Sequence, residues 1–121
     1  MTRINVGIDP SRLSSKHLIA EHREIKRIPN QISKGKYSMD NQPSEFKLGT
    51  GHVKFFYDKC GYLLTRYKSL YLECVKRGFN VQDYSDAWLG VPIDMMNDYT
   101  VKPIDIKIIE ERINERNSIR L

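Results

Sequence analysis

The run from residue 52 to residue 77, HVKFFYDKCGYLLTRYKSLYLECVKR, decides the fold of this chain. Its apolar side chains recur every three or four positions, which is the period of one face of an α-helix. They are Val53, Phe56, Cys60, Leu63, Leu64, Tyr67, Leu70, Tyr71 and Cys74. Gly49-Thr50-Gly51 precedes the run, and Lys76-Arg77-Gly78 closes it with bases that suit the negative helix end and a glycine that suits the left-handed cap. The sequence therefore predicts one long helix over 52–77.

A shorter helix is predicted on the N-terminal side of this run. Asp9 can accept from the free amides of a first helical turn, and proline is tolerated at the first helical position, where Pro10 stands. The helix then spans about 10–27, and Pro29-Asn30 ends it. The residues from 31 to 50 are mostly loop.

A third helix is predicted over 103–116, beginning at Pro103, after an irregular segment over 79–102. Three of its isoleucines share one face and should point inward: Ile106, Ile109 and Ile113. Together the segments predict an all-α fold, a single compact domain over residues 1–121 in which two shorter helices pack on one long central helix.

The composition excludes several classes of protein. A chain of 121 residues fits one domain, and 40% hydrophobic residues suffice for a core, unlike a disordered tail. No apolar run approaches the roughly 20 residues of a membrane span, and the first residues lack the apolar stretch of a signal peptide. We therefore expect a cytoplasmic protein, in the host cytoplasm if the source is viral. Cys60 and Cys74 offer neither a disulfide framework nor a zinc site, so we expect two reduced core thiols, no metal and no other cofactor.

The positive charge is concentrated at one end of the chain. The formal net charge is +5. Residues 1–36 carry eight basic and three acidic side chains, and residues 37–121 carry twelve of each, so the whole excess lies in the first 36 residues. Such a field suits a polyanion such as nucleic acid, because its phosphates release counterions when bases replace them. A solvated basic face that maintains solubility explains the charge equally well.

One face of the first predicted helix gathers bases around a single carboxylate. At about 100° per residue, six residues fall within a third of the circumference: Lys16, His17, Ala20, Arg23, Glu24 and Arg27. On one interpretation this is a solvent-exposed face in which Glu24 pairs with Arg27. On the other, the bases hold phosphates, the small Ala20 leaves room for a ligand, and Glu24 acts on a developing cation or a proton.

Thr2 directly follows the initiator Met1. A small second residue permits removal of the methionine, which leaves a threonine α-amine as the terminus. The pKa of an α-amine is about 7.7–8.0, against about 10.4 for lysine, so a substantial neutral fraction exists near neutral pH. A neutral amine attacks carbonyl or acetal carbons and forms an imine. Thr2 is therefore a candidate nucleophile.

The aromatic residues near the start of the long run have two possible uses. His52 and the neighbouring Phe55, Phe56 and Tyr57 suit either a buried core or a stacking role, and the core is the commoner use. His52 could equally cap the helix start. Trp88, the single tryptophan, could stack on a base, although packing of its loop on the helices is the commoner use.

Several strings in a fixed order carry a resemblance to a known family: Met1-Thr2-Arg3-Ile4-Asn5, His17-Leu18-Ile19-Ala20-Glu21-His22-Arg23-Glu24, Gly51-His52-Val53-Lys54-Phe55-Phe56-Tyr57-Asp58-Lys59 and Glu73-Cys74-Val75-Lys76-Arg77-Gly78-Phe79-Asn80. The chain resembles the pyrimidine-dimer DNA glycosylase family, the family of phage endonuclease V. The resemblance covers most of residues 1–83 and returns loosely from Asn97 to about Arg116. Three departures are the family's C-terminal tail rich in Trp and Tyr, for which this shorter chain has no counterpart, His22 in place of a usual aromatic residue, and a different loop over 84–96.

The resemblance implies an all-α DNA repair enzyme that is both a glycosylase and an abasic-site lyase, with duplex DNA as partner and no metal. It implies that the Thr2 amine attacks C1′ of the damaged nucleotide, the base leaves and a Schiff base forms. It implies that Glu24 steadies the cationic sugar and assists β-elimination. It also implies that these residues contact DNA or lie in the active site: Arg3, His17, Arg23, Arg27 and Arg116.

Two other functions stay open on the residues alone. A catalytically inactive relative would bind or sequester a small nucleotide or a nucleic acid in the same basic pocket, and retention of Met1 favours this, because it blocks the Thr2 amine. A small helical protein could also bind another protein through its second half. We expect a monomer in each case.

Overall fold

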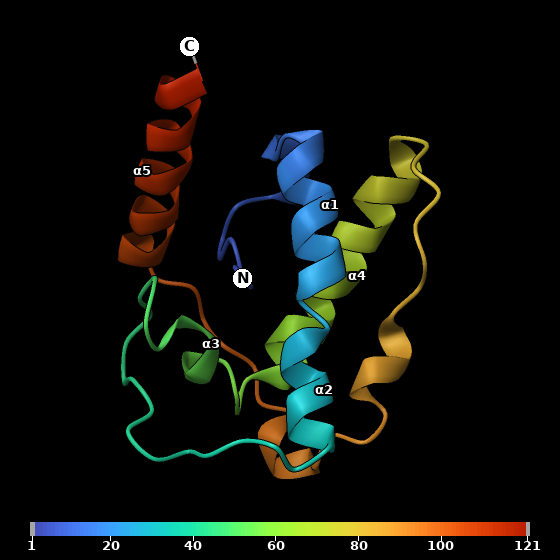
Figure 1. Ribbon diagram of the computed structural model, residues 1–121, viewed down its shortest axis with the longest axis vertical. Helices are drawn as coiled ribbons and strands as arrows, with labels where there is room; N and C mark the ends of the chain where they lie inside the picture. The colour runs from blue at the N-terminus through green and yellow to red at the C-terminus, as the bar shows by residue number, and fades with distance from the viewer. Residues whose placement is uncertain (1, 121) are drawn as a thin grey trace.

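The computed structural model describes the backbone of residues 2–120 and the side chains of residues 2–114. Helices follow one another along this backbone (Figure 1). They are η1 (Pro10–Arg12), α1 (Ser15–Glu24), α2 (Arg27–Ser33), α3 (His52–Phe55), α4 (Cys60–Lys76), η2 (Ser85–Trp88), η3 (Ile93–Met95) and α5 (Pro103–Arg120), where η marks a 3-10 helix. The described residues form no β-strand, only an isolated bridge between Lys59 and Met96. The prediction of an all-α fold with a long central helix, α4, is confirmed.

The long helix begins later than predicted. The run 52–77 holds two helices, because the chain leaves the helical path after Phe55. The side-chain amide of Gln42 donates to the carbonyl oxygens of Lys54 and Phe55, each at 3.2 Å, and Nζ of Lys59 donates to the same Phe55 oxygen at 2.9 Å. These side chains satisfy carbonyl groups that a continuous helix would use, so the prediction of one helix over 52–77 is wrong in its first part.

The predicted end of this helix is confirmed. α4 ends at Lys76, and Gly78 follows in the left-handed region with a φ of +82°. The N–H of Phe79 donates to the carbonyl oxygen of Cys74 at 2.9 Å. This bond closes the helix end as the Lys-Arg-Gly sequence indicates.

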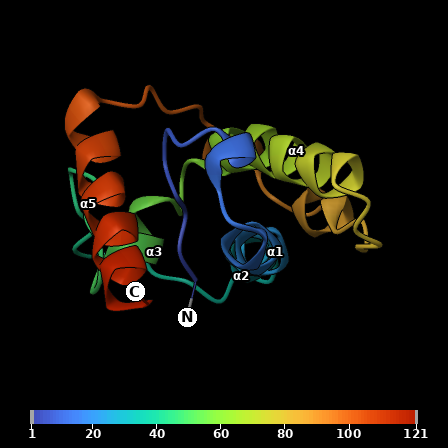
Figure 2. The same cartoon turned by 90° about the horizontal axis from the view of Figure 1, so that it is seen from above.

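The helix predicted over 10–27 is interrupted, so this prediction is wrong. Asp9 caps a helix start as expected, accepting from a main-chain N–H at 2.9 Å, but that start is only the short turn η1. α1 begins anew where Oγ of Ser14 accepts from the N–H of His17 at 3.3 Å. Pro29 does not end a helix, because it lies in the first turn of α2, where its missing N–H is not needed. α2 continues nearly in line with α1 (Figures 1 and 2).

The third predicted helix is confirmed, and it runs to Arg120 rather than to residue 116. Ile109 is fully buried, and Ile106 and Ile113 pack partly buried on the core, so the predicted inward face is also confirmed. A Cβ atom on Gly7 would lie 2.5 Å from Cγ1 of Ile106. The absence of a side chain at Gly7 therefore lets α5 lie directly on the N-terminal segment.

The N-terminal segment, residues 2–9, contributes to the core. Ile4, Val6 and Ile8 are all buried. Both views show the segment passing between α5 on one side and α1 on the other (Figures 1 and 2). The terminus is therefore supported on both sides by helices.

Trp88 and the two cysteines are core residues, as predicted. Trp88 is buried, and its Nε1 donates to the carbonyl oxygen of Cys60 at 3.0 Å, which packs its loop on α4. Cys60 and Cys74 are free and buried, and burial raises the pKa of the Cys60 thiol to about 12. Neither thiol is reactive in this setting.

A buried ion pair ties the N-terminal segment to α1 and α4. Arg66 on α4 donates to Glu21 on α1 from Nε at 2.5 Å and from Nη2 at 3.1 Å. Nη1 of Arg66 donates to the carbonyl oxygen of Ile8 at 2.8 Å, and Nδ2 of Asn5 donates to Oε1 of Glu21 at 2.7 Å. The side chains of Glu21 and Arg66 are 1% and 7% exposed, so each charge depends on the other for compensation.

Arg66→Met should destabilise the fold strongly. Methionine fills much of the volume but leaves Glu21 buried without its cationic partner, which costs about 3–5 kcal/mol. We expect that loss in the free energy of unfolding measured by urea denaturation. Arg12→Met is the matched control, because it breaks the exposed Arg12–Glu110 pair and should cost less than about 1 kcal/mol. Equally small losses in both variants would contradict a structural role for the buried pair.

Candidate active site

The amino terminus is held in place by the residues directly behind it. The main-chain N–H of Ile4 donates to Nε2 of His52 at 2.9 Å, and the Asn5–Glu21 bond follows one residue later. The side chain of Ile4 is fully buried. Thr2 is therefore presented from an anchored backbone rather than from a loose end.

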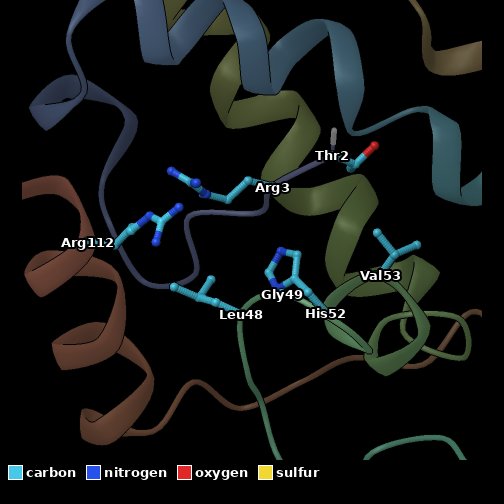
Figure 3. A pocket seen from close by; sticks show the side chains of 7 residues that line it. All are labelled: Thr2, Arg3, Leu48, Gly49, His52, Val53 and Arg112. Atoms are coloured by element: carbon cyan, nitrogen blue, oxygen red, sulfur yellow. The ribbon is translucent and has the colours of Figure 1, made fainter. Parts of the chain in front are cut away.

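Thr2 lines a pocket with a volume of about 170 Å³ (Figure 3). The lining residues come from the N-terminal segment, the loop before α3, α3 and α5: Thr2, Arg3, Leu48, Gly49, His52, Val53 and Arg112. The guanidinium groups of Arg3 and Arg112 approach one another at one end, and Thr2 lies toward the other (Figure 3). Two guanidinium groups at one end of a pocket form a geometry that can bind a phosphate.

Arg112 is a site residue that the sequence did not predict. It lies on α5, far from Arg3 in the sequence, and only the packing of α5 on the N-terminal segment brings the two together. The predicted Arg116 is one helical turn further along α5, and its side chain lies outside the described residues. The i,i+4 spacing of Arg112 and Arg116, which puts both on one side of a helix, is the sequence signal that could have found Arg112.

Glu24 is recessed at the C-terminal end of α1. Its side chain is 14% exposed, and its Oε2 accepts from Nη2 of Arg23 at 3.3 Å. The proposed pairing of Glu24 with Arg27 is wrong, because α1 ends at Glu24 and Arg27 belongs to α2. Glu24 is not among the described residues lining the pocket. It lies one turn beyond Glu21, whose contact with Asn5 fixes the N-terminal segment.

The basic side chains predicted to surround that carboxylate lie at the surface. Lys16, Arg23 and Arg27 are exposed, whereas His17 and Ala20 are partly buried. The face predicted from helical spacing therefore has exposed cations around a recessed carboxylate. That arrangement can bind an anionic strand and stabilise a positive centre that develops beside it.

His52 is buried and neutral. Because its Nε2 accepts from the N–H of Ile4, the ring proton lies on Nδ1, which donates to the carbonyl oxygen of Lys47 at 2.8 Å. Burial of the ring lowers the pKa of His52 from its ordinary 6.5; the Lys47 hydrogen bond and Glu21 oppose this shift, and Arg3 adds to it. The ring does not cap α3, which was one use the sequence allowed, and Phe55 and Phe56 beside it are core residues.

The described residues hold no cluster of His, Cys, Asp and Glu side chains arranged to bind a metal ion. No helix among these residues is both long enough and apolar enough to cross a membrane.

A comparison with protein families adds an identification to this geometry. The family model for pyrimidine dimer DNA glycosylase matches residues 1–85 of the 121. The match includes the N-terminal segment, α1 to α4 and every predicted site residue except Arg116, while α5 with Arg112 follows it. Since the match covers well over half of the chain, this protein belongs to the pyrimidine dimer DNA glycosylase family, a family of DNA repair enzymes.

Proposed function

We propose that this protein is a DNA N-glycosylase with abasic-site lyase activity, acting as a monomer in the cytoplasm on a damaged or modified base in duplex DNA. The observation that carries the proposal is the setting of Thr2. Its backbone is anchored by Ile4, and it lines a pocket that also holds the guanidinium groups of Arg3 and Arg112. Removal of Met1 leaves the Thr2 α-amine in this pocket as a nucleophile.

The amine starts the reaction. After the target nucleotide leaves the base stack, the neutral nitrogen of Thr2 forms a bond to C1′. The bond from C1′ to the base breaks, its electron pair leaves with the base, and the base takes up a proton. Opening of the sugar ring then gives an imine between Thr2 and C1′.

Glu24 acts as the base in the second half of the reaction. Its carboxylate stabilises the cationic sugar and takes a proton from C2′ of the imine. The electron pair of that C–H bond forms a double bond to C3′, and the bond from C3′ to the phosphate oxygen breaks. The strand is cut by β-elimination, and water then hydrolyses the imine and regenerates the amine.

The cations position the DNA for this chemistry. Arg3 and Arg112 hold a phosphate next to the target sugar, because their guanidinium groups approach the same end of the pocket. The exposed side chains of Lys16, Arg23 and Arg27 contact phosphates along the strand. We assign His17 to the same surface.

Incision assays test the proposal with protein whose methionine has been removed. Three duplexes are compared, carrying an abasic site, a pyrimidine dimer or no damage. We expect cleavage at the abasic site and release of the damaged base, with the undamaged duplex left intact. No turnover on any duplex, together with stoichiometric binding of a nucleotide that is released unchanged, would identify a binding protein instead.

Arg112→Gln should weaken DNA binding in a salt-dependent way. Loss of one phosphate contact lowers the slope of log K against log salt concentration by about 1. Fluorescence anisotropy of a labelled abasic duplex over a salt series measures that slope. Arg12→Gln is the charge-matched control, since Arg12 is exposed and paired with Glu110 away from the pocket. An identical slope in wild type and Arg112→Gln would exclude Arg112 from phosphate binding.

A further inference from the structure

Both ring nitrogens of His52 bond to the backbone of other segments. Nε2 accepts a hydrogen bond from the N–H of Ile4 at 2.9 Å, and Nδ1–H donates to the carbonyl oxygen of Lys47 at 2.8 Å. The ring stands between the N-terminal segment and the loop that carries Leu48 and Gly49 (Figure 3). His52 thus connects the segment that ends in the nucleophile to the loop before α3.

Packing holds the imidazole ring itself in place. Phe46 and Phe56 meet the ring edge to face, with ring centroids 5.4 Å from it in each case, and His52 is only 4% exposed. A ring confined by close packing does not follow a moving backbone. It therefore offers the N–H of Ile4 an acceptor at a fixed place.

We propose that His52 is a positioning residue for the amino-terminal nucleophile: it holds the main chain of Ile4 so that the Thr2 amine, two residues away, has one place in the pocket. The inference rests on the proposed function, because it concerns the amine chemistry. His52 acts through the backbone of Ile4.

Among the hydrogen bonds that Ile4, Asn5 and Ile8 make to other segments, the Ile4 bond is nearest to Thr2 in the sequence. The bonds of Asn5 to Glu21 and of the Ile8 carbonyl to Arg66 lie further from the terminus. Nucleophilic attack needs reacting atoms about 3–3.5 Å apart and correctly aligned, and a displacement of about 1 Å lowers the rate on the order of 100-fold. Loss of the Ile4 anchor should therefore slow imine formation more than it weakens DNA binding.

Protonation of His52 removes the acceptor, because Nε2 then carries a hydrogen that faces the N–H of Ile4. The charged groups that act on the ring are Arg3 on the N-terminal segment and Glu21 on α1, while Lys47 offers its carbonyl oxygen. Arg112 on α5 lines the same pocket. Burial lowers the pKa of His52 below 6.5. The neutral, anchoring form is thus fully present above pH 6.5 and is lost as the pH falls through the lowered pKa of the folded protein.

Three variants separate positioning from packing. His52→Phe keeps a planar ring between Phe46 and Phe56 but offers no acceptor, and His52→Gln returns an amide oxygen near the place of Nε2. His22→Phe is the control, because His22 is also a buried histidine whose pKa is lowered by burial, but its ring stacks on Tyr67 of α4, 5.3 Å away.

Three quantities are measured: the single-turnover rate of the borohydride-trapped adduct on an abasic duplex, the affinity for that duplex, and hydrogen exchange at the Ile4 amide.

We expect His52→Phe to form the adduct on the order of 10- to 100-fold more slowly at nearly unchanged affinity. Its Ile4 amide should exchange faster than in wild type. His52→Gln should recover most of the rate, and His22→Phe should stay within about twofold of wild type. The ratio of the wild-type rate to the His52→Gln rate should fall as the pH is lowered through the pKa of His52, because titration of Thr2 and Glu24 cancels in the ratio.

A wild-type rate in folded His52→Phe would overturn the inference. If His52→Phe does not fold, exchange of the wild-type Ile4 amide at the rate of an unprotected amide would overturn it. Failure of the proposed function looks different, since wild type itself would then form no adduct. In that case the Ile4 amide decides, and equal protection factors for that amide in wild type and His52→Phe, each corrected for the intrinsic exchange rate, would refute the anchoring.

Discussion

Glu24→Gln should abolish strand cleavage while the protein still binds duplex DNA. Glutamine keeps the size of the side chain but cannot take a proton from C2′ or compensate a cationic sugar. Loss of general-base catalysis alone lowers a rate on the order of 10²- to 10⁴-fold. Binding should not suffer, because the carboxylate is recessed and its removal leaves Arg23 available to phosphate. Cleavage of an abasic duplex and anisotropy on the same duplex measure the two effects.

Glu45→Gln is the control for this experiment. Glu45 is an exposed carboxylate in the loop between α2 and α3, so the variant makes the same change of charge away from α1. It should cleave like wild type. Cleavage by Glu24→Gln at the same rate would remove Glu24 from the mechanism, and a parallel loss of affinity would make Glu24 a binding residue.

Blocking the terminal amine should reduce adduct formation to background. Retained Met1 moves the amine one residue away from the anchored backbone, and Nα-acetylation of Thr2 removes its nucleophilic lone pair. Any unmodified terminal amine has a pKa of about 7.7–8.0. Loss of activity with Met1 retained would therefore show that the position of the amine matters, because its basicity is unchanged. Intact-mass measurement establishes which terminus each sample carries, and single-turnover lyase assays report the effect.

DNA binding provides the internal control for blocked protein. The exposed cations of α1 and α2 are unchanged, so affinity for an abasic duplex should stay close to that of the free-amine form. Full lyase activity in acetylated protein would show that another group, such as a lysine amine, is the nucleophile.

Helical periodicity identified where helices exist in this chain but not where they are interrupted. The apolar face of α4 and the helix end at Lys76-Arg77-Gly78 depend on residues that are close in the sequence, and the structure contains both as predicted. The break after Phe55 depends on Gln42, whose amide takes the carbonyl groups of two distant residues. Such a side chain competes with a helix only after the loop has folded over it, so no local pattern reveals the break.

The candidate site likewise contains residues that the sequence identifies and residues that only the folded structure brings together. Thr2 and Arg3 are adjacent in sequence and share the pocket, and Glu24 stood out as one carboxylate among bases. The sequence indicates only that Arg112 shares one side of a helix with the predicted Arg116. Its place in the pocket depends on the packing of α5 against the N-terminal segment. The two-sided hydrogen bonding of His52 likewise joins residues that are far apart in the chain.

The most direct test is to trap the reaction intermediate and find its attachment point. Protein freed of Met1 is incubated with an abasic duplex in the presence of borohydride, and the adduct is digested and sequenced by mass spectrometry. The reduced sugar should be found on the α-nitrogen of Thr2 in equimolar amount with the DNA trapped. An adduct on a lysine side chain, or no adduct from protein whose mass confirms a free Thr2 amine, would contradict the central claim.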